Sequence, residues 1–172
     1  MYLFAIQVIT GTENRFINSS TKNNAEIGER LFYPRRKLSI RKNGITKEQL
    51  CPLFAGYVFF RNQESKLDTE TISFIKKQDC FVRILKDTKN PLCLSPKDAE
   101  LIHHFINGRG ISDISTVYFD ENNRIVVESG PLKGLEGKIV KVDRRKQRAK
   151  ISLDLYNDKF LIDLGFKVIS KV

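Results

Sequence analysis

The stretch that decides the fold is SGPLKGLEGKIV, residues 129–140. Gly130-Pro131 can turn the chain out of a preceding strand, and Gly134 and Gly137 can take backbone conformations that are closed to other residues. The pattern also fits ordinary tight turns of a small β-barrel. It does not fit a nucleotide-binding phosphate loop, because the Gly-Lys-Ser/Thr ending is missing and a strand rather than a helix follows.

The whole C-terminal part has the pattern of short strands separated by turns. Five apolar, β-branched runs follow Arg124, at residues 125–127, 138–142, 149–155, 160–164 and 168–169. Five short strands in so short a segment predict a small five-stranded barrel over 124–172. The basic run at 143–150 is expected to be a hairpin connection with its charges in solvent.

Residues 1–107 alternate between strand-like and helix-like patterns. Strands are expected at 2–9, 31–41, 45–50, 57–60 and 81–85, with Asn43-Gly44 as a two-residue hairpin turn. Helices are expected at 13–22, at 69–77 with Asp68 or Thr69 as N-cap, and from Pro96 to Asn107-Gly108 with Ser95 as N-cap; residues 23–29 are expected to be loop. This order predicts an α+β domain with helices on an antiparallel sheet. A polar linker at 108–123 would join it to the barrel.

The charge of the chain favours polyanionic partners. The net charge over 172 residues is +10, and residues 124–172 hold 12 Lys and Arg against 6 Asp and Glu. Binding to phosphates releases counterions from a nucleic acid, which favours such partners. Three widely spaced cysteines indicate reduced thiols in a cytoplasmic protein, and no apolar run predicts a membrane span.

Together these segments resemble the NusG family of transcription elongation and antitermination proteins, most closely its LoaP-type specialised paralogues. Residues 129–140 resemble a KOW motif. Three segments of this chain resemble the NGN domain of the same family. They are LFAIQVITGTE at residues 3–13, PRRK at 34–37 and LFAGYVFF at 53–60. Two departures are Leu3-Phe4, where the family often has Trp-Tyr, and Ala55-Gly56-Tyr57, where it often has Pro-Gly-Tyr.

The resemblance implies that the NGN-like part binds the clamp helices of the largest RNA polymerase subunit through an apolar surface. By carry-over, the expected contacts are Phe4, Phe54 and Tyr57. The alternative is that these three side chains belong to the core of the sheet. Four basic residues around the PRRK segment are expected to touch upstream or non-template DNA, although they could also be charges that protect an edge strand. They are Arg35, Arg36, Lys37 and Arg41.

For the KOW-like part, the resemblance implies contact with a nascent RNA hairpin in LoaP-type proteins, and with the termination factor Rho or a ribosomal protein in general NusG proteins. Basic side chains favour RNA here, because arginine binds phosphates and stacks on bases. A solvated turn is the alternative. The expected RNA contacts are Lys133, Lys138, Lys141, Arg144, Arg145, Lys146, Arg148 and Lys150.

No arrangement of residues predicts catalysis, a metal or a cofactor. His103 and His104 are neighbours on an expected helix, and neighbours point about 100° apart, which makes them poor joint metal ligands. The sequence therefore predicts a monomeric antiterminator that binds polymerase and RNA and catalyses no reaction. The alternatives left open are a general NusG elongation factor and a free KOW-type RNA-binding or ribosome-associated module.

Overall fold

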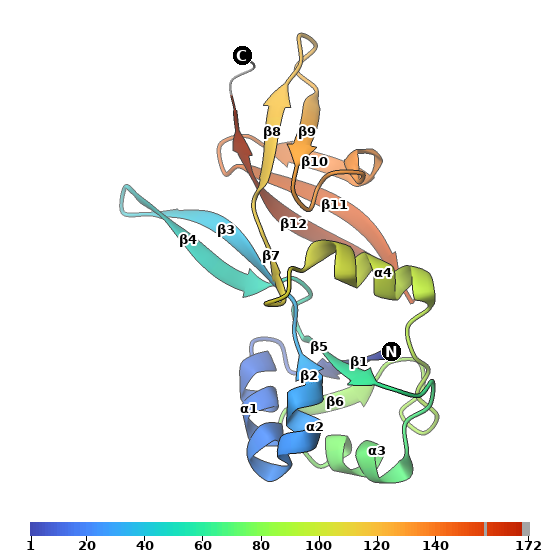
Figure 1. Ribbon diagram of the computed structural model, residues 1–172. Coiled ribbons are helices and arrows are strands. Elements are labelled where there is room, and N and C mark those ends of the chain that lie inside the picture. The colour runs from blue at the N-terminus through green and yellow to red at the C-terminus, as the bar shows by residue number, and fades with distance from the viewer. Residues whose placement is uncertain (157, 170–172) are drawn as a thin grey trace. The chain divides into compact units, whose positions relative to one another are not determined.

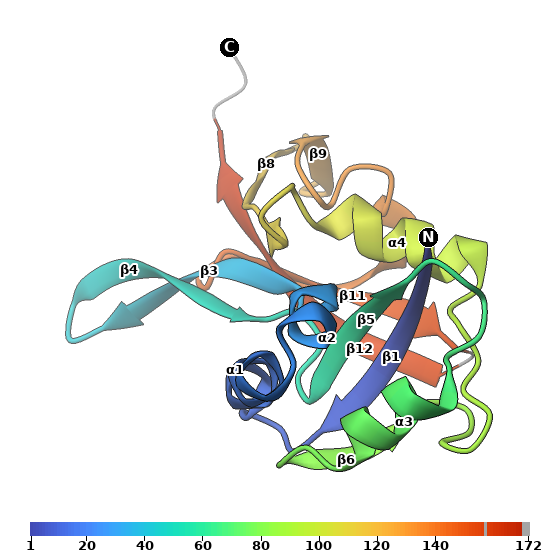
Figure 2. The same ribbon diagram turned by 60° about the horizontal axis from the view of Figure 1, so that its bottom comes forward.

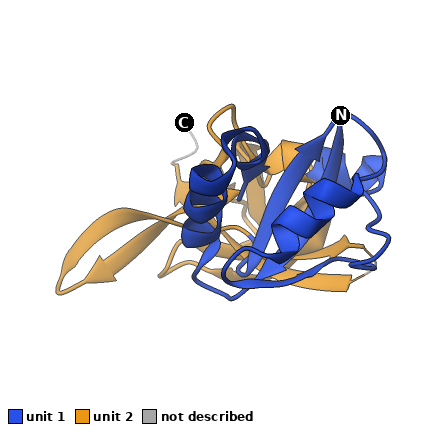
Figure 3. Ribbon diagram, turned by 90° about the horizontal axis from the view of Figure 1, so that it is seen from below, with its two compact units in different colours: residues 1–33, 54–101 blue, residues 34–53, 102–172 orange. Residues whose placement is uncertain are grey.

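The computed structural model describes residues 1–156 and 158–169. The chain divides into two compact units, coloured separately in Figure 3. Unit 1 is formed by Met1–Tyr33 and Phe54–Leu101, and unit 2 by Pro34–Leu53 and the chain from Ile102 onward. These boundaries differ from the expected ones, because residues 34–53 join the C-terminal part. Independent folding of residues 1–107 and 124–172 as domains stays a prediction.

Unit 1 contains an antiparallel sheet of four strands with three helices (Figure 1). The strands occur in the spatial order β2-β5-β1-β6, with β1 and β5 at the centre as their apolar composition predicts. The elements are β1 (Tyr2–Val8), α1 (Glu13–Asn23), α2 (Ala25–Arg30), β2 (Leu31–Phe32), β5 (Tyr57–Asn62), α3 (Thr69–Lys76) and β6 (Phe81–Ile84).

The core of unit 1 lies between the sheet and its helices (Figure 2). Alternate residues of a strand point to the same face, so Phe4, Ile6 and Val8 of β1 face the helices together. Phe16 of α1 and Ile75 of α3 pack against them with no exposed surface. Burying aromatic and branched side chains of this size stabilises the unit by roughly 1.5–3 kcal/mol for each.

Local side-chain caps begin the helices where the sequence indicates. In α3, the Asp68 carboxylate accepts hydrogen bonds from the Thr71 backbone N–H and hydroxyl, both at 2.7 Å. The backbone bond, followed by the hydroxyl bond, lowers the pKa of Asp68. In α4 (Pro96–Phe105), the Ser95 hydroxyl accepts from the Asp98 N–H at 3.2 Å. The expected helices at both places are confirmed.

Unit 2 contains a three-stranded sheet and a curled five-stranded sheet. The first has the order β4-β3-β7 and the second the order β10-β11-β12-β8-β9. Its strands, with one short 3₁₀ turn η1, are β3 (Arg35–Lys42), β4 (Ile45–Pro52), β7 (Ile111–Ser112), β8 (Ser115–Phe119), β9 (Ile125–Ser129), η1 (Glu136–Lys138), β10 (Ile139–Asp143), β11 (Arg148–Leu155) and β12 (Asp158–Val168). The mixed α+β class and the five-stranded C-terminal sheet agree with the expectation.

Two strands of the curled sheet differ from the expected pattern. Residues 160–164 and 168–169 are not separate strands, because β12 runs unbroken through Gly165. The fifth strand is β8, which lies inside the segment expected to be a linker and pairs with both β12 and β9. Residues 165–167 were expected to separate two strands, but the backbone of Gly165 is extended within β12. The missing side chain of Gly165 allows the close approach of β3 that is described below.

Two shorter predictions also need correction. Residues 23–29 were expected to be loop, but most of them form α2, whose N-cap Asn24 accepts from the Ile27 N–H at 3.1 Å. Gly137 was expected to allow a backbone conformation closed to other residues, but it lies in η1 with a φ that is not positive and does not use that freedom. Gly130 and Gly134 do have positive φ, at 95° and 81°. Among the described residues, no helix has the length and apolar character needed to cross a membrane.

Candidate nucleic-acid interface

The expected polymerase contacts are mostly buried in unit 1. Phe4 has no exposed surface and belongs to the core under the helices, while Phe54 is 3% exposed. The Phe54 ring meets Phe59 edge-on, with 5.9 Å between centroids. Tyr57 is half-buried. The three side chains therefore do not form one exposed patch, and Phe4 and Phe54 are buried, as in the alternative left open. Polymerase contact by these residues stays a prediction.

An aromatic row lies on the face of the unit 1 sheet opposite Phe4. The register places Ala5 opposite Phe59 and Gln7 opposite Tyr57, so these side chains share that face. The Phe59 ring lies between Phe32, at 5.8 Å between centroids, and Phe54. We call Phe32, Phe54, Tyr57 and Phe59 the aromatic row. Its half-buried members, Phe32 and Tyr57, present apolar surface.

A cation borders the aromatic row. The Arg61 guanidinium carbon lies 3.9 Å from the Phe32 ring centroid. Burial lowers the pKa of Arg61. Such a stack is worth about 0.5–2 kcal/mol and keeps the ring in one orientation.

The turn that precedes Tyr57 is fixed by a buried carboxylate and a glycine. Gly56 has a φ of 82°, and a Cβ there would lie 2.9 Å from the Thr10 hydroxyl oxygen. Its N–H donates to the Glu13 carboxylate at 2.6 Å. These contacts hold Tyr57 at the start of β5.

The expected DNA contacts on β3 differ in how strongly the rest of unit 2 holds them. Lys37 forms an ion pair with Asp113 at 2.6 Å; this raises the pKa of Lys37 and lowers that of Asp113, mainly through the hydrogen bond between the two side chains. Burial lowers the pKa of Arg36, whose Nη1 donates to the Leu53 carbonyl at 3.4 Å. Arg35 is half-buried, whereas Arg41 is exposed near the end of the strand.

A tight turn presents two of the expected RNA contacts. Gln147 N–H donates to the Arg144 carbonyl at 3.3 Å, and Lys146 N–H donates to the Asp143 carboxylate at 2.9 Å. Gln147 takes a φ of 52°, which closes the turn between β10 and β11. Arg145 and Lys146 occupy its two corner positions and are exposed.

Three other expected RNA contacts are tethered. The Arg144 guanidinium lies 3.7 Å from the Phe119 ring centroid and donates to the Asn123 carbonyl at 3.0 Å. Lys150 forms an ion pair with Asp163 at 3.0 Å. Lys133 Nζ donates to the Glu128 carbonyl at 2.9 Å. Lys138 and Lys141 are exposed.

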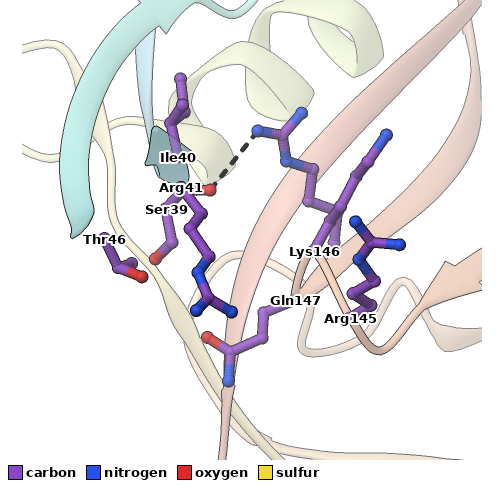
Figure 4. A pocket seen from close by; sticks show the side chains of 8 residues that line it. Ser39, Ile40, Arg41, Thr46, Arg145, Lys146 and Gln147 are labelled. Carbon is purple, nitrogen blue, oxygen red and sulfur yellow. Dashed lines mark hydrogen bonds between the residues drawn. The ribbon is translucent and has the colours of Figure 1, made fainter. Parts of the chain in front are cut away.

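Within unit 2, Gly165 allows β3 to approach β12. A Cβ at this glycine would lie 2.8 Å from the Lys37 carbonyl oxygen, closer than real Cβ contacts. In the β11–β12 register, Gly165 pairs with Arg148. Arg148 Nη2 can therefore reach the Ser39 carbonyl, at 3.4 Å, shown as the dashed line in Figure 4.

A pocket with a volume of about 620 Å³ opens beside these contacts. Figure 4 shows Arg41 entering it from β3, and Arg145, Lys146 and Gln147 coming from the turn. We call it the basic pocket; its lining residues are Ser39, Ile40, Arg41, Thr46, Arg145, Lys146, Gln147 and Arg148. The lining contains four cations and no carboxylate. A smaller pocket of about 160 Å³ shares Lys146 and Arg148 and adds Lys141, Asp143, Lys150 and Asp163.

A comparison with models of protein families shows which family the chain belongs to. Residues 1–103 match the family model described as transcription termination factor nusG. The chain belongs to the NusG family. This NusG-family match runs from β1 into α4 and so includes the aromatic row and the whole of the β3–β4 hairpin.

Curated relatives extend the match over nearly the whole chain. A protein named transcription termination/antitermination protein NusG from Buchnera aphidicola subsp. Acyrthosiphon pisum is 21% identical over 98% of this chain and 94% of its own length. Proteins of the same name from Escherichia coli O6:H1 and Synechocystis sp. are 20% and 22% identical, again over 98% of this chain, and over 94% and 88% of their own lengths. The NusG-family likeness thus includes the five-stranded C-terminal sheet.

A solved structure titled "Domain interaction in Thermotoga maritima NusG" is also similar. It shares 14% sequence identity over 95% of this chain and 93% of its own, with a TM-score of 0.48. A score below 0.5 does not establish a shared fold, so the NusG-family membership rests on the sequence matches.

Sequence reasoning missed several residues of the basic pocket. Ser39, Thr46 and Gln147 carry no charge and belong to no motif, so no local signal indicates them. Gly165 was visible only as a glycine in a strand-like run, which is itself a sign of close backbone approach. Among the described residues, no three His, Cys, Asp or Glu side chains form a group that could hold a metal ion.

Proposed function

We propose that this NusG-family chain is a transcription elongation and antitermination regulator that binds RNA polymerase through unit 1 and contacts RNA through unit 2. The observation that carries the proposal is the family match over residues 1–103, extended by NusG-named relatives over 98% of the chain. Such a protein performs no chemistry. It acts by binding the active elongating polymerase more tightly than the paused one, and so shifts the balance between them. Its place of action would be the cytoplasm.

The aromatic row is the proposed polymerase contact, with the clamp helices of the largest subunit as partner. Aromatic and arginine side chains are enriched at the energetic centres of protein interfaces. Phe32 and Tyr57 are half-buried, and the buried Phe59 ring contacts both Phe32 and Phe54. Arg61, stacked on Phe32, supplies a polar edge.

RNA contact by unit 2 is supported by its charge. Arg145 and Lys146 are exposed at the corners of the turn. In the described part of the chain, the side chains of both residues form no hydrogen bond or ion pair. They are therefore available to phosphates, and this favours an RNA-reading antiterminator of the LoaP type.

A general NusG elongation factor is the second candidate. The curated relatives that match 98% of the chain carry the name of the general termination/antitermination protein. In that case unit 2 would contact Rho or a ribosomal protein. A free KOW-type module is disfavoured, because the family match lies in residues 1–103.

Binding of the full chain to purified RNA polymerase tests the proposal. Tyr57→Ala is expected to weaken binding about ten-fold or more, as truncation of a central tyrosine does at other interfaces. Tyr2→Ala removes an exposed tyrosine from the same sheet and serves as the matched control. Unchanged affinity of a folded Tyr57→Ala protein would remove the aromatic row as the contact, and no binding by the unaltered chain would reject the function.

A further inference from the structure

We propose that the basic pocket holds the phosphate backbone of one nucleic-acid strand, so that RNA and DNA compete for it. The sequence predicted DNA contact by β3 and RNA contact by the turn between β10 and β11. Instead, Arg41 of the first set and Arg145, Lys146 and Arg148 of the second line one pocket. The proposal rests on the proposed RNA contact and replaces two separate sites by a single one.

The charges of the pocket favour a polyanion. Arg41, Arg145 and Lys146 are exposed, and their side chains have no hydrogen-bond or ion-pair partner within the described ranges 1–156 and 158–169. No carboxylate lines the pocket, so nothing there compensates the cations. Arginine binds phosphate oxygens in a two-pronged manner, and several cations side by side match the repeated charges of a phosphate backbone.

Neutral donors complete the lining. The Ser39 and Thr46 hydroxyls and the Gln147 amide can hydrogen-bond to phosphate and sugar oxygens, as such side chains do in most protein–nucleic acid contacts. A volume of about 620 Å³ falls within the range of small-ligand pockets. The smaller second pocket shares the cations Lys146 and Arg148 with the basic pocket, but two carboxylates, Asp143 and Asp163, also line it.

The two walls of the pocket are held together within unit 2. The close approach at Gly165 brings β3 against β12, and the bond from Arg148 to the Ser39 carbonyl links β11 to β3. Arg41 therefore lies beside the turn because of two independent contacts. A strand that binds the turn also meets Arg41, which is why separate RNA and DNA sites are not expected.

Fluorescence anisotropy of the full chain with short single-stranded RNA and DNA of the same sequence tests the proposal. Arg41→Ala and Arg145→Ala are each expected to weaken the binding of both strands about three- to ten-fold. Each should also lower the slope of log affinity against log salt concentration by about one. Arg109→Ala is the control, since Arg109 is exposed in unit 2 but does not line the pocket. Unlabelled DNA is expected to displace labelled RNA completely.

Each of the following results would overturn the proposal. In the first, Arg41→Ala weakens only the binding of DNA and Arg145→Ala weakens only the binding of RNA, or the protein binds both strands at the same time. In the second, Lys133→Ala or Lys138→Ala weakens RNA while the pocket variants do not; the proposed RNA contact would then survive without the pocket. In the third, a poly-glutamate peptide binds more tightly than either strand, which would indicate an acidic protein partner. If the unaltered chain binds neither strand, the RNA contact fails as well, although polymerase binding would stand.

Discussion

The Glu13 carboxylate, at the first turn of α1, accepts a hydrogen bond from the Gly56 N–H at 2.6 Å. Glu13 is only 3% exposed, and Gly56 is also buried. A carboxylate at a helix N-terminus is favoured by the helix dipole, which offsets part of the cost of its burial. The bond joins the first helix to the turn that ends at Tyr57, so one residue links the core of unit 1 to the aromatic row.

Glu13→Ala is expected to lower the free energy of unfolding by about 1–3 kcal/mol, because the Gly56 N–H would stay buried without an acceptor. Glu13→Gln keeps an acceptor oxygen and should cost less. Urea unfolding followed by circular dichroism measures both. Glu70→Ala is the matched control, since Glu70 lies in the first turn of α3 and is exposed. Equal losses for Glu13→Ala and Glu70→Ala would show that the Gly56 bond contributes nothing.

Substitution of the three glycines in residues 129–140 by alanine should lower the free energy of unfolding by different amounts. Gly130 combines a φ of 95° with a Cβ position only 2.6 Å from the Ser115 Cα, so Gly130→Ala should cost more than about 2 kcal/mol. Gly134 has a φ of 81° but open space, and Gly134→Ala should cost about 1 kcal/mol. Gly137→Ala should change little, because Gly137 has neither constraint. Denaturation midpoints measure the order, and a Gly137→Ala cost equal to that of Gly130→Ala would contradict it.

The Asp68 cap should make stability depend on acid pH. Hydrogen bonds from Thr71 lower the pKa of Asp68 in the folded state, so the cap contributes above the unfolded pKa of about 3.9 and is lost as pH falls through the folded value. Asp68→Ala should lower the free energy of unfolding by about 0.5–2 kcal/mol at pH 7. Below the folded pKa of Asp68, the free energies of unfolding of the unaltered protein and of the Asp68→Ala variant should become equal. Thermal unfolding over an acid pH series measures this, and a difference that stays constant down to the lowest pH would exclude the cap as its source.

Arg144 and Arg145 are neighbours with different expected roles. Arg144 stacks on Phe119 and donates to the Asn123 carbonyl, so Arg144→Ala should destabilise unit 2 by about 1 kcal/mol and change RNA affinity little. Arg145→Ala should have the opposite effects, because its side chain is exposed in the basic pocket. Unfolding and RNA titrations of both variants decide the matter. Equal loss of RNA affinity in the two would show that the stack does not withhold Arg144 from RNA.

Local signals explain why much of the fold could be predicted. The Asn43-Gly44 turn, the Asp68 cap and the Ser95 cap each depend on a few neighbouring residues. In contrast, β8 was expected to be linker. Its antiparallel partner β9 is the next strand along the chain, but its parallel partner β12 lies far away, and no local pattern indicates that second pairing. The unbroken β12 was missed for a similar reason, since only the approach of β3 explains Gly165.

The candidate site was harder to predict than the fold. On β1, Leu3 and Phe4 are both apolar, so the sequence cannot tell which one faces the helices and which lies on the face of the aromatic row. Among the basic residues, composition alone cannot separate Lys37, paired with Asp113, from the exposed Arg41, because the ion pair depends on tertiary structure.

Transcription in vitro through an intrinsic terminator tests the central claim most directly, with and without the protein, on templates with and without leader RNA from its own locus. A polymerase-bound, RNA-reading antiterminator should increase read-through only when the leader is present, and Tyr57→Ala should abolish the increase. Read-through that does not depend on the leader would instead indicate the general elongation factor. No effect of the unaltered protein on either template would contradict the proposed function.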